Sequence, residues 1–269
     1  MRTAQPVSAS DVRLRLVALP TEHGGWSFLL EPIALGLLVA PSLAGLLLGI
    51  AAVGVFLTRH PLTVALGDRR RGKRYPRTIW AERFALLYGL VALVAFGTAL
   101  LLTMSFWPAL LLAAPLALMQ FVHDLRKQSR ALLAEVAGAW ALAAAATALA
   151  LAGGMALVPA LGLWCVLAAR AAPAIMYVRT RIQRLRGHAG AAWPALLAHT
   201  IGLAVVLCLA AFAICSWLAV LALALLLGRA FYGLAPERVA VRPATIGMQE
   251  LAFAALTVFL TALGNTLGL

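Results

Sequence analysis

The chain has 269 residues, of which 64% are hydrophobic and only 12% are charged. A soluble domain carries about twice that fraction of charged residues, so the composition argues against a soluble protein, and the alternating polarity that a strand-built barrel needs is absent. The net charge of +13 could suggest nucleic-acid binding. In a chain this apolar we instead interpret the basic residues as topology signals and as contacts to anionic phospholipids, and we expect no nucleic-acid partner.

The first 20 residues form a short basic arm, predicted to be cytoplasmic, without the apolar segment that a cleaved signal peptide requires. Residues 21–269 are predicted to form a single transmembrane helical domain. Apolar runs long enough to cross a hydrocarbon core of about 30 Å recur along it. Nine runs are predicted, at about 26–41, 43–58, 80–103, 107–122, 132–152, 157–177, 193–214, 216–233 and 246–267. The expected fold class is therefore an all-α, polytopic transmembrane bundle.

The connections between these runs alternate in charge. Those after the second, fourth, sixth and eighth runs are basic, like the N-terminal arm, whereas the other four contain no Lys or Arg. Basic connections tend to stay on the cytoplasmic side of a membrane. The pattern predicts a cytoplasmic N-terminus, and nine crossings then place the C-terminus outside.

Two basic segments are candidates for binding an anion. Arg59–Arg77 contains seven basic residues and a single acid, Asp68, and Arg179–His188 contains four arginines. Guanidinium forks suit phosphate and carboxylate groups, so the two segments could together hold a polyanionic head. Taken alone, the two segments favour the simpler interpretation that they orient the chain and attract anionic lipid.

Several polar residues fall within the apolar runs, all on the predicted cytoplasmic side. An ionisable group in lipid costs several kcal/mol unless it is paired or hydrated. The glutamates could therefore pair with Arg170, Arg83 or other arginines and lock the helices together, or they could line a polar pocket open to the cytoplasm. Both interpretations stay open at this stage. The residues concerned are Glu31, Glu135, Arg170, His199 and Glu250.

The histidines and cysteines do not indicate a metal site. The five histidines lack the spacing of a metal-binding helix, and the three cysteines, all within apolar stretches, contain no Cys-x-x-Cys pair. His23 is the best single candidate for a functional histidine, because it lies beside Glu22 and precedes Gly24 and Gly25, which let backbone approach a ligand closely. A flexible entry turn explains the two glycines equally well.

The run from Glu22 to Pro32, EHGGWSFLLEP, resembles the opening signature of the YwiC-like family of bacterial membrane proteins. The segments Arg59–Leu62, Arg126–Glu135 and Tyr177–Arg181 fit the same family. The resemblance covers most of the chain and implies a multi-pass protein of the bacterial cytoplasmic (inner) membrane. It implies no settled activity.

A weaker resemblance is to the UbiA superfamily of intramembrane prenyltransferases, which is similar in having nine helices and long cytoplasmic loops after the second and sixth. In that superfamily these loops carry aspartate-rich motifs that hold Mg²⁺ and an isoprenoid diphosphate. Only Asp68 matches such an aspartate here, and no Asp or Glu occurs between Glu135 and Glu237. Because a Mg²⁺ site needs carboxylates, no cofactor is expected, and whether the protein is an enzyme stays open.

The sequence thus predicts a UbiA-like bundle with a cytoplasm-facing pocket that binds an amphiphile with a phosphorylated or acidic head, such as a membrane lipid or an isoprenoid. The alternatives are a transporter or permease, and a non-catalytic assembly or partner subunit. His23, Glu31 and Glu135 are the expected proton-handling or orienting residues. The expected ligand-binding residues are Arg59, His60, Asp68, Arg69, Arg70, Arg71, Arg170, Arg179 and Arg181.

Overall fold

The computed structural model describes residues 14–19, 23–126, 128–235 and 242–269, and in this part of the chain every regular element is a helix. The side chains at positions 23, 24 and 125 also lie outside the description. Most of the predicted N-terminal arm falls outside the described residues. Its last part forms the short helix α1 (Leu14–Ala18), which packs against α3 and α4.

Nine longer helices follow α1 within the described residues, which confirms the prediction of an all-α polytopic bundle of about nine helices. They are α2 (His23–Val39), α3 (Leu43–Arg70), α4 (Pro76–Leu102), α5 (Trp107–Leu125), α6 (Leu132–Ala152), α7 (Leu157–Leu185), α8 (Trp193–Ala211), α9 (Trp217–Gly233) and α10 (Pro243–Leu267).

Six of these helices, α3, α4, α6, α7, α8 and α10, are long and apolar enough to cross a membrane, and shorter apolar helices lie within α2 and at α9. The apolar composition of the runs favours helices because a helix satisfies its own backbone polar groups in lipid. Local signals set the ends. Ser42 and Ser216 cap α3 and α9 by accepting hydrogen bonds from Gly45 N and Ala219 N, and Gly268, with φ of 67°, ends α10 in the left-handed conformation.

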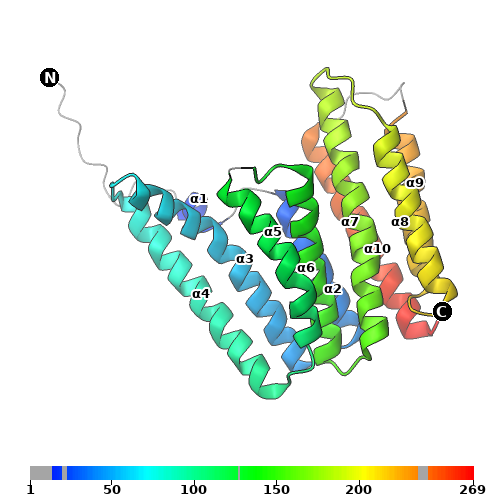
Figure 1. Cartoon of the computed structure of the whole chain (residues 1–269), viewed down its shortest axis with the longest axis horizontal. Helices are drawn as coiled ribbons and strands as arrows, with labels where there is room; N and C mark the ends of the chain where they lie inside the picture. The colour runs from blue at the N-terminus through cyan, green and yellow to red at the C-terminus, as the bar shows by residue number, and fades with distance from the viewer. Residues whose placement is uncertain (1–13, 20–22, 127, 236–241) are drawn as a thin grey trace.

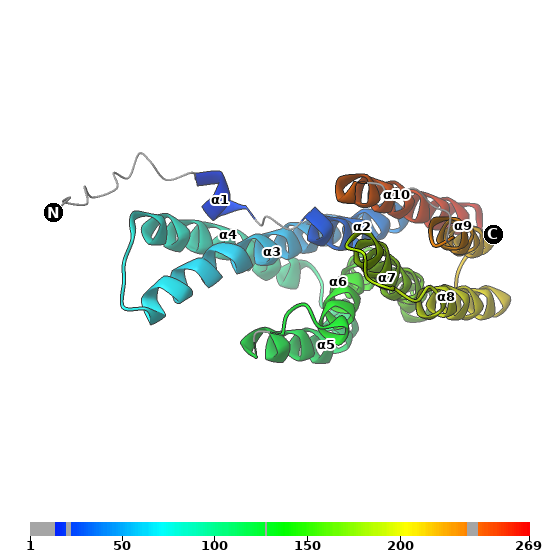
Figure 2. The same cartoon turned by 90° about the horizontal axis from the view of Figure 1, so that it is seen from above.

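The helices form two layers, as seen from above in Figure 2. One layer contains α4, α3, α2 and α10 in that order, and the other contains α5, α6, α7 and α8, with α9 joining α8 to α10. Contacts of α6 with α2 and α3, and of α7 with α2 and α10, hold the layers together.

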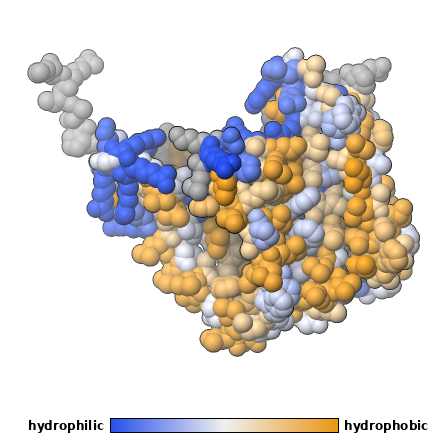
Figure 3. All heavy atoms as spheres, viewed as in Figure 1, coloured by the Kyte–Doolittle hydropathy of each residue, from blue (hydrophilic) through white to orange (hydrophobic). Residues whose placement is uncertain are grey.

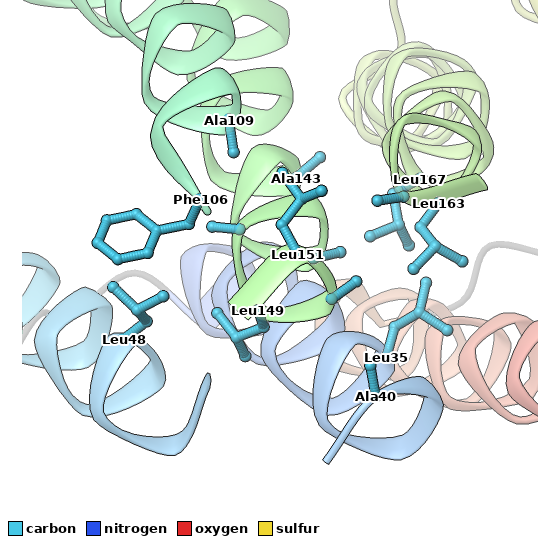
Figure 4. Packing of buried hydrophobic residues seen from close by; sticks show 14 of the residues in the cluster. Leu35, Ala40, Leu48, Phe106, Ala109, Ala143, Leu149, Leu151, Leu163 and Leu167 are labelled. Carbon is cyan, nitrogen blue, oxygen red and sulfur yellow. The ribbon is translucent and has the colours of Figure 1, made fainter. Parts of the chain in front are cut away.

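The central helix is α6, which packs against α2, α3, α5 and α7. Eight of its twelve buried residues are alanines, so neighbouring backbones approach closely, as small residues permit in membrane bundles. A Cβ added to Gly36 of α2 would lie 2.7 Å from Leu149 Cβ of α6. Figure 4 shows Leu149 and Leu151 of α6 between Leu35, Leu48 and Phe106 of α2, α3 and the start of α5, and Leu163 of α7.

The basic connections lie together at one end of the bundle (Figure 1). This end, which we call the basic end, carries the α3–α4, α5–α6 and α7–α8 connections together with the end of α9 and the start of α10. The predicted basic connection between α9 and α10 lies mostly outside the described residues. On the face drawn in Figure 3, hydrophilic residues gather at this end and hydrophobic residues cover most of the rest. The charge alternation read from the sequence thus corresponds to a real asymmetry of the fold. That the basic end faces the cytoplasm stays a prediction.

The two basic segments differ from the expected loops. The second predicted run stopped at residue 58, but α3 continues to Arg70, so only residues 71–75 connect it to α4. The extension is helical because Ala65 is buried in a cluster with Val17 and Ala81. Likewise α7 continues through Pro173 to Leu185, which places most of the second basic segment on a helix.

Candidate functional site

Four buried charged side chains from four helices meet in the half of the bundle nearer the basic end. Arg170 of α7 donates from Nη1 to Glu31 Oε2 of α2 at 2.5 Å, and from Nη2 to the Glu250 carbonyl of α10 at 3.2 Å. Arg229 of α9 pairs through Nη1 with Glu250 Oε1. The side chains of Arg170, Glu31, Arg229 and Glu250 are 1%, 7%, 7% and 14% exposed. We call these four residues the buried charge cluster.

Polar and aromatic groups surround this cluster. Ser27, one turn before Glu31, hydrogen-bonds to the Glu31 carboxylate. The guanidinium of Arg229 lies 4.1 Å from the ring centroid of Tyr177 and 5.0 Å from that of Phe253, within the range of cation–π contacts. His199 of α8 lies edge-on to Tyr177, with 6.3 Å between ring centroids, and its Nδ1 is 2.7 Å from the Ala195 carbonyl.

Three nitrogen atoms of the cluster have no hydrogen-bond partner among the described residues. They are Nε of Arg170 and both Nε and Nη2 of Arg229, each fully buried. A buried guanidinium N–H that lacks an acceptor is costly, because it has lost its hydration without compensation. The geometry therefore leaves hydrogen-bonding capacity in the interior of the bundle.

Two arginines near the end of α7 bind the end of α9. Arg181, which is buried, donates from Nη1 to the Gly233 carbonyl at 2.9 Å and to Tyr177 Oη at 3.0 Å. Arg184 donates to the Leu234 carbonyl at 2.7 Å. Cations at a helix C-terminus satisfy its unpaired carbonyls and interact favourably with its dipole. These arginines therefore fix α9 to α7.

Glu135 at the start of α6 is also paired. Arg179 of α7 donates from Nη1 to Glu135 Oε2 at 2.8 Å and to the Arg130 carbonyl at 2.9 Å. Both side chains are about one-third exposed, at 34% for Glu135 and 37% for Arg179. The structure thus gives both Glu31 and Glu135 an arginine partner, which is the arrangement expected if these carboxylates lock helices together.

Asp68 is held within the α3–α4 turn. Arg77 donates from Nη2 to Oδ1 at 2.7 Å and from Nε to Oδ2 at 3.0 Å, and Thr78 donates to Oδ2 at 2.8 Å. The Asp68 side chain is only 3% exposed. The Asp68 oxygens therefore stabilise the turn by accepting hydrogen bonds from Arg77 and Thr78. A carboxylate bonded in this way by a guanidinium and a hydroxyl does not fit a Mg²⁺ site. Among the described residues, no group of three or more His, Cys, Asp and Glu lies close enough to hold a metal ion.

The other predicted residues of α3 lie along the basic end. Arg59 pairs with Asp124 of α5 at 2.6 Å, Nε2 of His60 is 3.0 Å from the Leu16 carbonyl of α1, and Arg69 pairs with Glu82 of α4 at 2.7 Å. Arg70 and Arg71 are exposed. His23 opens α2, but its side chain lies outside the described residues, so its predicted role cannot be placed.

The predicted site residues do not converge on one pocket. The structure brings Glu31 to Arg170 and Glu135 to Arg179, whereas Figure 1 shows the α3–α4 turn and the end of α7 on different sides of the bundle. Sequence reasoning missed Arg229, which lies inside the eighth apolar run. An arginine within an apolar run was itself the signal that could have found it.

An apolar groove is lined by residues of α2, α3 and α4. Its volume is about 270 Å³. Apart from Tyr88 every lining residue is aliphatic or glycine, and Gly54 allows α3 to approach α4 so closely that an added Cβ would lie 3.0 Å from the Tyr88 carbonyl. The lining residues are Ile33, Leu37, Leu46, Gly49, Ile50, Val53, Gly54, Leu57, Tyr88 and Val91.

The comparison with protein families is informative for the first part of the chain. Residues 19–150 match the family described as YwiC-like protein. This YwiC-like region runs through α2, α3, α4 and α5 and nearly all of α6. The family resemblance predicted from the EHGGWSFLLEP signature is confirmed there. Together with the six long apolar helices, this similarity supports an integral membrane protein whose first half resembles the YwiC-like family.

No curated protein and no solved structure matches the chain. The weaker resemblance to the UbiA superfamily therefore stays a prediction. The YwiC-like region contains Glu31 and the apolar groove, whereas Arg170, Arg229 and Glu250 lie beyond it.

Proposed function

We propose that this YwiC-like membrane protein binds an amphiphile with a phosphorylated or acidic head, and that the α2–α3–α4 groove takes the apolar tail. The observation that carries the proposal is the position of the groove on α3. Its lining ends at Leu57, and Arg59 and His60 follow at once. The α3 residues that line the groove recur at helical spacing, so His60 continues the same face of α3. Arg59 lies beside this face, about 200° around the helix from Leu57, where it pairs with Asp124 of α5. An apolar slot with basic residues at and beside its end matches the two chemically different ends of an amphiphile.

The length of α3 supports this arrangement. Its 28 residues extend over about 42 Å at 1.5 Å per residue, which exceeds a hydrocarbon core of about 30 Å. Arg59 lies 16 positions after Leu43, or about 24 Å along the axis. The groove thus lies at the depth of lipid tails, and Arg59 lies near the depth of headgroups.

The basic residues available to a head lie on the same hairpin. The side chain of Arg59 is 51% exposed although it contacts Asp124, so an anion could approach it from the membrane surface. Arg70 and Arg71 are exposed farther along the helix. Each basic residue near an anionic surface contributes about 1 kcal/mol of attraction. By contrast Arg179 and Arg181, which were expected to share this task, are engaged with Glu135 and Gly233.

The proposal concerns binding and includes no transfer reaction. In a prenyltransferase of the UbiA type, carboxylates would hold Mg²⁺ against a diphosphate, and the one matching aspartate here, Asp68, is bonded to Arg77 and Thr78. Arginine contacts would instead neutralise the head directly.

The test is the lipid that co-purifies with the protein, measured by mass spectrometry. Val53→Trp should fill the groove and Arg59→Gln should remove the first head contact, each lowering a specific phosphorylated or acidic amphiphile at least fivefold. Matched controls are Val94→Trp, on the exposed face of α4, and Arg186→Gln, in the α7–α8 connection. Bulk lipid alone, in equal amounts in all five proteins, would refute the proposal.

A second candidate is a non-catalytic assembly or partner subunit. It is supported by the ion pairs of Glu31 and Glu135, which give both carboxylates a structural role. The same purification separates the two candidates, because a partner protein bound in fixed ratio, with bulk lipid only, would favour the assembly subunit.

A further inference from the structure

The buried charge cluster carries an inference that is independent of the groove, since it lies on another face of α2. Glu31 and Ile33 are two positions apart, or about 200° around the helix. Ile33 lines the groove, whereas Glu31 points to Arg170 of α7. The two places can therefore be altered separately.

The guanidinium of Arg229 has one edge without a hydrogen-bond partner in the described part of the chain. Nη1 pairs with Glu250, while Nε and Nη2 have no acceptor there. Nε and Nη2 form the side-on fork of an arginine, the edge that binds both oxygens of a carboxylate. Arg77 uses the same two atoms to bind both oxygens of Asp68, at 3.0 and 2.7 Å.

The aromatic neighbours do not replace an acceptor at this edge. Tyr177 and Phe253 lie 4.1 and 5.0 Å from the guanidinium carbon, which stabilises the charge through ring faces. The N–H groups of the fork still need oxygen atoms in their plane. The Arg229 side chain is 7% exposed, so bulk water does not surround it.

The local charge also calls for an anion. Arg181 also approaches Tyr177, with its guanidinium carbon 5.8 Å from the ring centroid, and is itself buried. Arg170 and Arg229 pair with Glu31 and Glu250, whereas Arg181 binds the Gly233 carbonyl and the Tyr177 hydroxyl and has no carboxylate partner among the described residues. One positive charge is left without a counter-charge among the described residues, in a region where an uncompensated charge is costly.

We propose that the Nε–Nη2 fork of Arg229 binds a monovalent oxyanion, of the carboxylate or phosphate class, between α7, α9 and α10. The bound anion satisfies the two N–H groups and neutralises the remaining charge of the surrounding arginines. Nε of Arg170, also without a described partner, belongs to the same cluster and offers a further donor.

The experiment measures the melting temperature of the purified full chain in nanodiscs with sodium formate, sodium phosphate or sodium chloride at matched ionic strength. A ligand that binds the folded state raises this temperature in a saturable way. We expect a rise of ~3 °C or more over chloride with at least one oxyanion. Formate and phosphate distinguish a carboxylate site from a phosphate site within the same class.

Two variants assign the effect to the fork. Arg229→Lys keeps the positive charge but cannot bind an oxyanion in a bidentate way, so it should abolish the rise in melting temperature. Arg77→Lys is the matched control, because its fork is already bonded to Asp68, and it should leave the rise intact. An equal rise in Arg229→Lys, or no rise over chloride in the unaltered protein, overturns the proposal.

Glu237 lies outside the described residues and is tested directly. Glu237→Gln should respond like the unaltered protein. A response that appears only in Glu237→Gln would show that this carboxylate is the partner of the fork, and would overturn the proposal. If Arg229→Lys does not fold, infrared spectra of the unaltered protein decide, recorded with the oxyanion that raises the melting temperature, either ¹³C-formate or phosphate. A shifted, saturable band of the bound anion is expected, and the solution band alone would contradict the proposal.

Discussion

Arg170 and Glu31, 139 positions apart in the chain, form an ion pair of 2.5 Å that joins α7 to α2 inside the membrane domain. Their side chains are 1% and 7% exposed. Removing one partner of a buried pair leaves an uncompensated charge, which is more destabilising than removing both.

The first prediction concerns this pair. Glu31→Gln or Arg170→Gln alone should lower the free energy of unfolding by about 3–5 kcal/mol. The double variant Glu31→Gln with Arg170→Gln should lose less than the two single losses combined, which a double-mutant cycle in detergent unfolding would measure. Glu135→Gln serves as the control, because its pair with Arg179 is about one-third exposed and should contribute only about 0–1 kcal/mol. Additive losses would contradict coupling within the buried pair.

The second prediction concerns the contact of α9 with α7. An added Cβ on Gly233 would lie 2.9 Å from Arg181 Nη1 and would also collide with the Tyr177 hydroxyl. Gly233→Ala should therefore lower the melting temperature, by displacing the arginine that binds the end of α9. Gly228→Ala is the matched control on the same helix, since an added Cβ there meets no atom within 4 Å. It should be neutral or stabilising by up to about 1 kcal/mol. Equal melting temperatures for the two variants would rule out this role for Gly233.

The third prediction concerns the turn between α3 and α4. Asp68→Asn weakens the acceptor of the Arg77 fork and of Thr78, so the turn should open more often. Trypsin should then cleave at Lys73 and Arg74 about tenfold faster, which corresponds to about 1.4 kcal/mol. Glu82→Gln removes only the more exposed pairs with Arg69 and Arg74 and should change the rate little. A rate for Asp68→Asn that matches the unaltered protein would count against the turn's dependence on Asp68.

The fourth prediction concerns orientation. If the basic end is cytoplasmic, a fluorescent protein inserted after Lys73 should fluoresce, whereas alkaline phosphatase fused after Leu269 should be active outside. Each reporter is also inserted after Thr103, at the opposite end of the bundle. As a control, alkaline phosphatase should be active there and the fluorescent protein should not fluoresce. A fusion after Leu269 that is inactive as phosphatase but fluorescent would reverse the assigned topology.

The apolar runs were sufficient to predict the number and order of the long helices, because nearly every residue of a membrane helix must be apolar. They were insufficient where helices leave the membrane. α3 continues to Arg70 and α7 to Leu185, since a helix that projects into water can carry charges on its exposed side. A rule that ends a helix at the first arginine therefore shortens both.

From the sequence we could predict that the buried charged residues pair with one another, but not which residues form each pair. The sequence placed Glu31, Glu250 and Arg170 on the same side of the membrane, but helix rotation and neighbour order decide which groups meet. Glu250 pairs with Arg229, 21 positions earlier, rather than through its side chain with Arg170, whose second contact is the Glu250 backbone carbonyl. Which arginine meets which glutamate depends on how α2, α7, α9 and α10 pack together.

The pair of Arg170 with Glu31 has a consequence for the boundary of the YwiC-like match. The matched region, residues 19–150, includes the glutamate but ends before the arginine. A fragment cut at that boundary would insert a lone carboxylate into lipid, together with the side of α6 that α7 covers. Compensation of the Glu31 charge in the membrane interior thus requires both halves of the polypeptide.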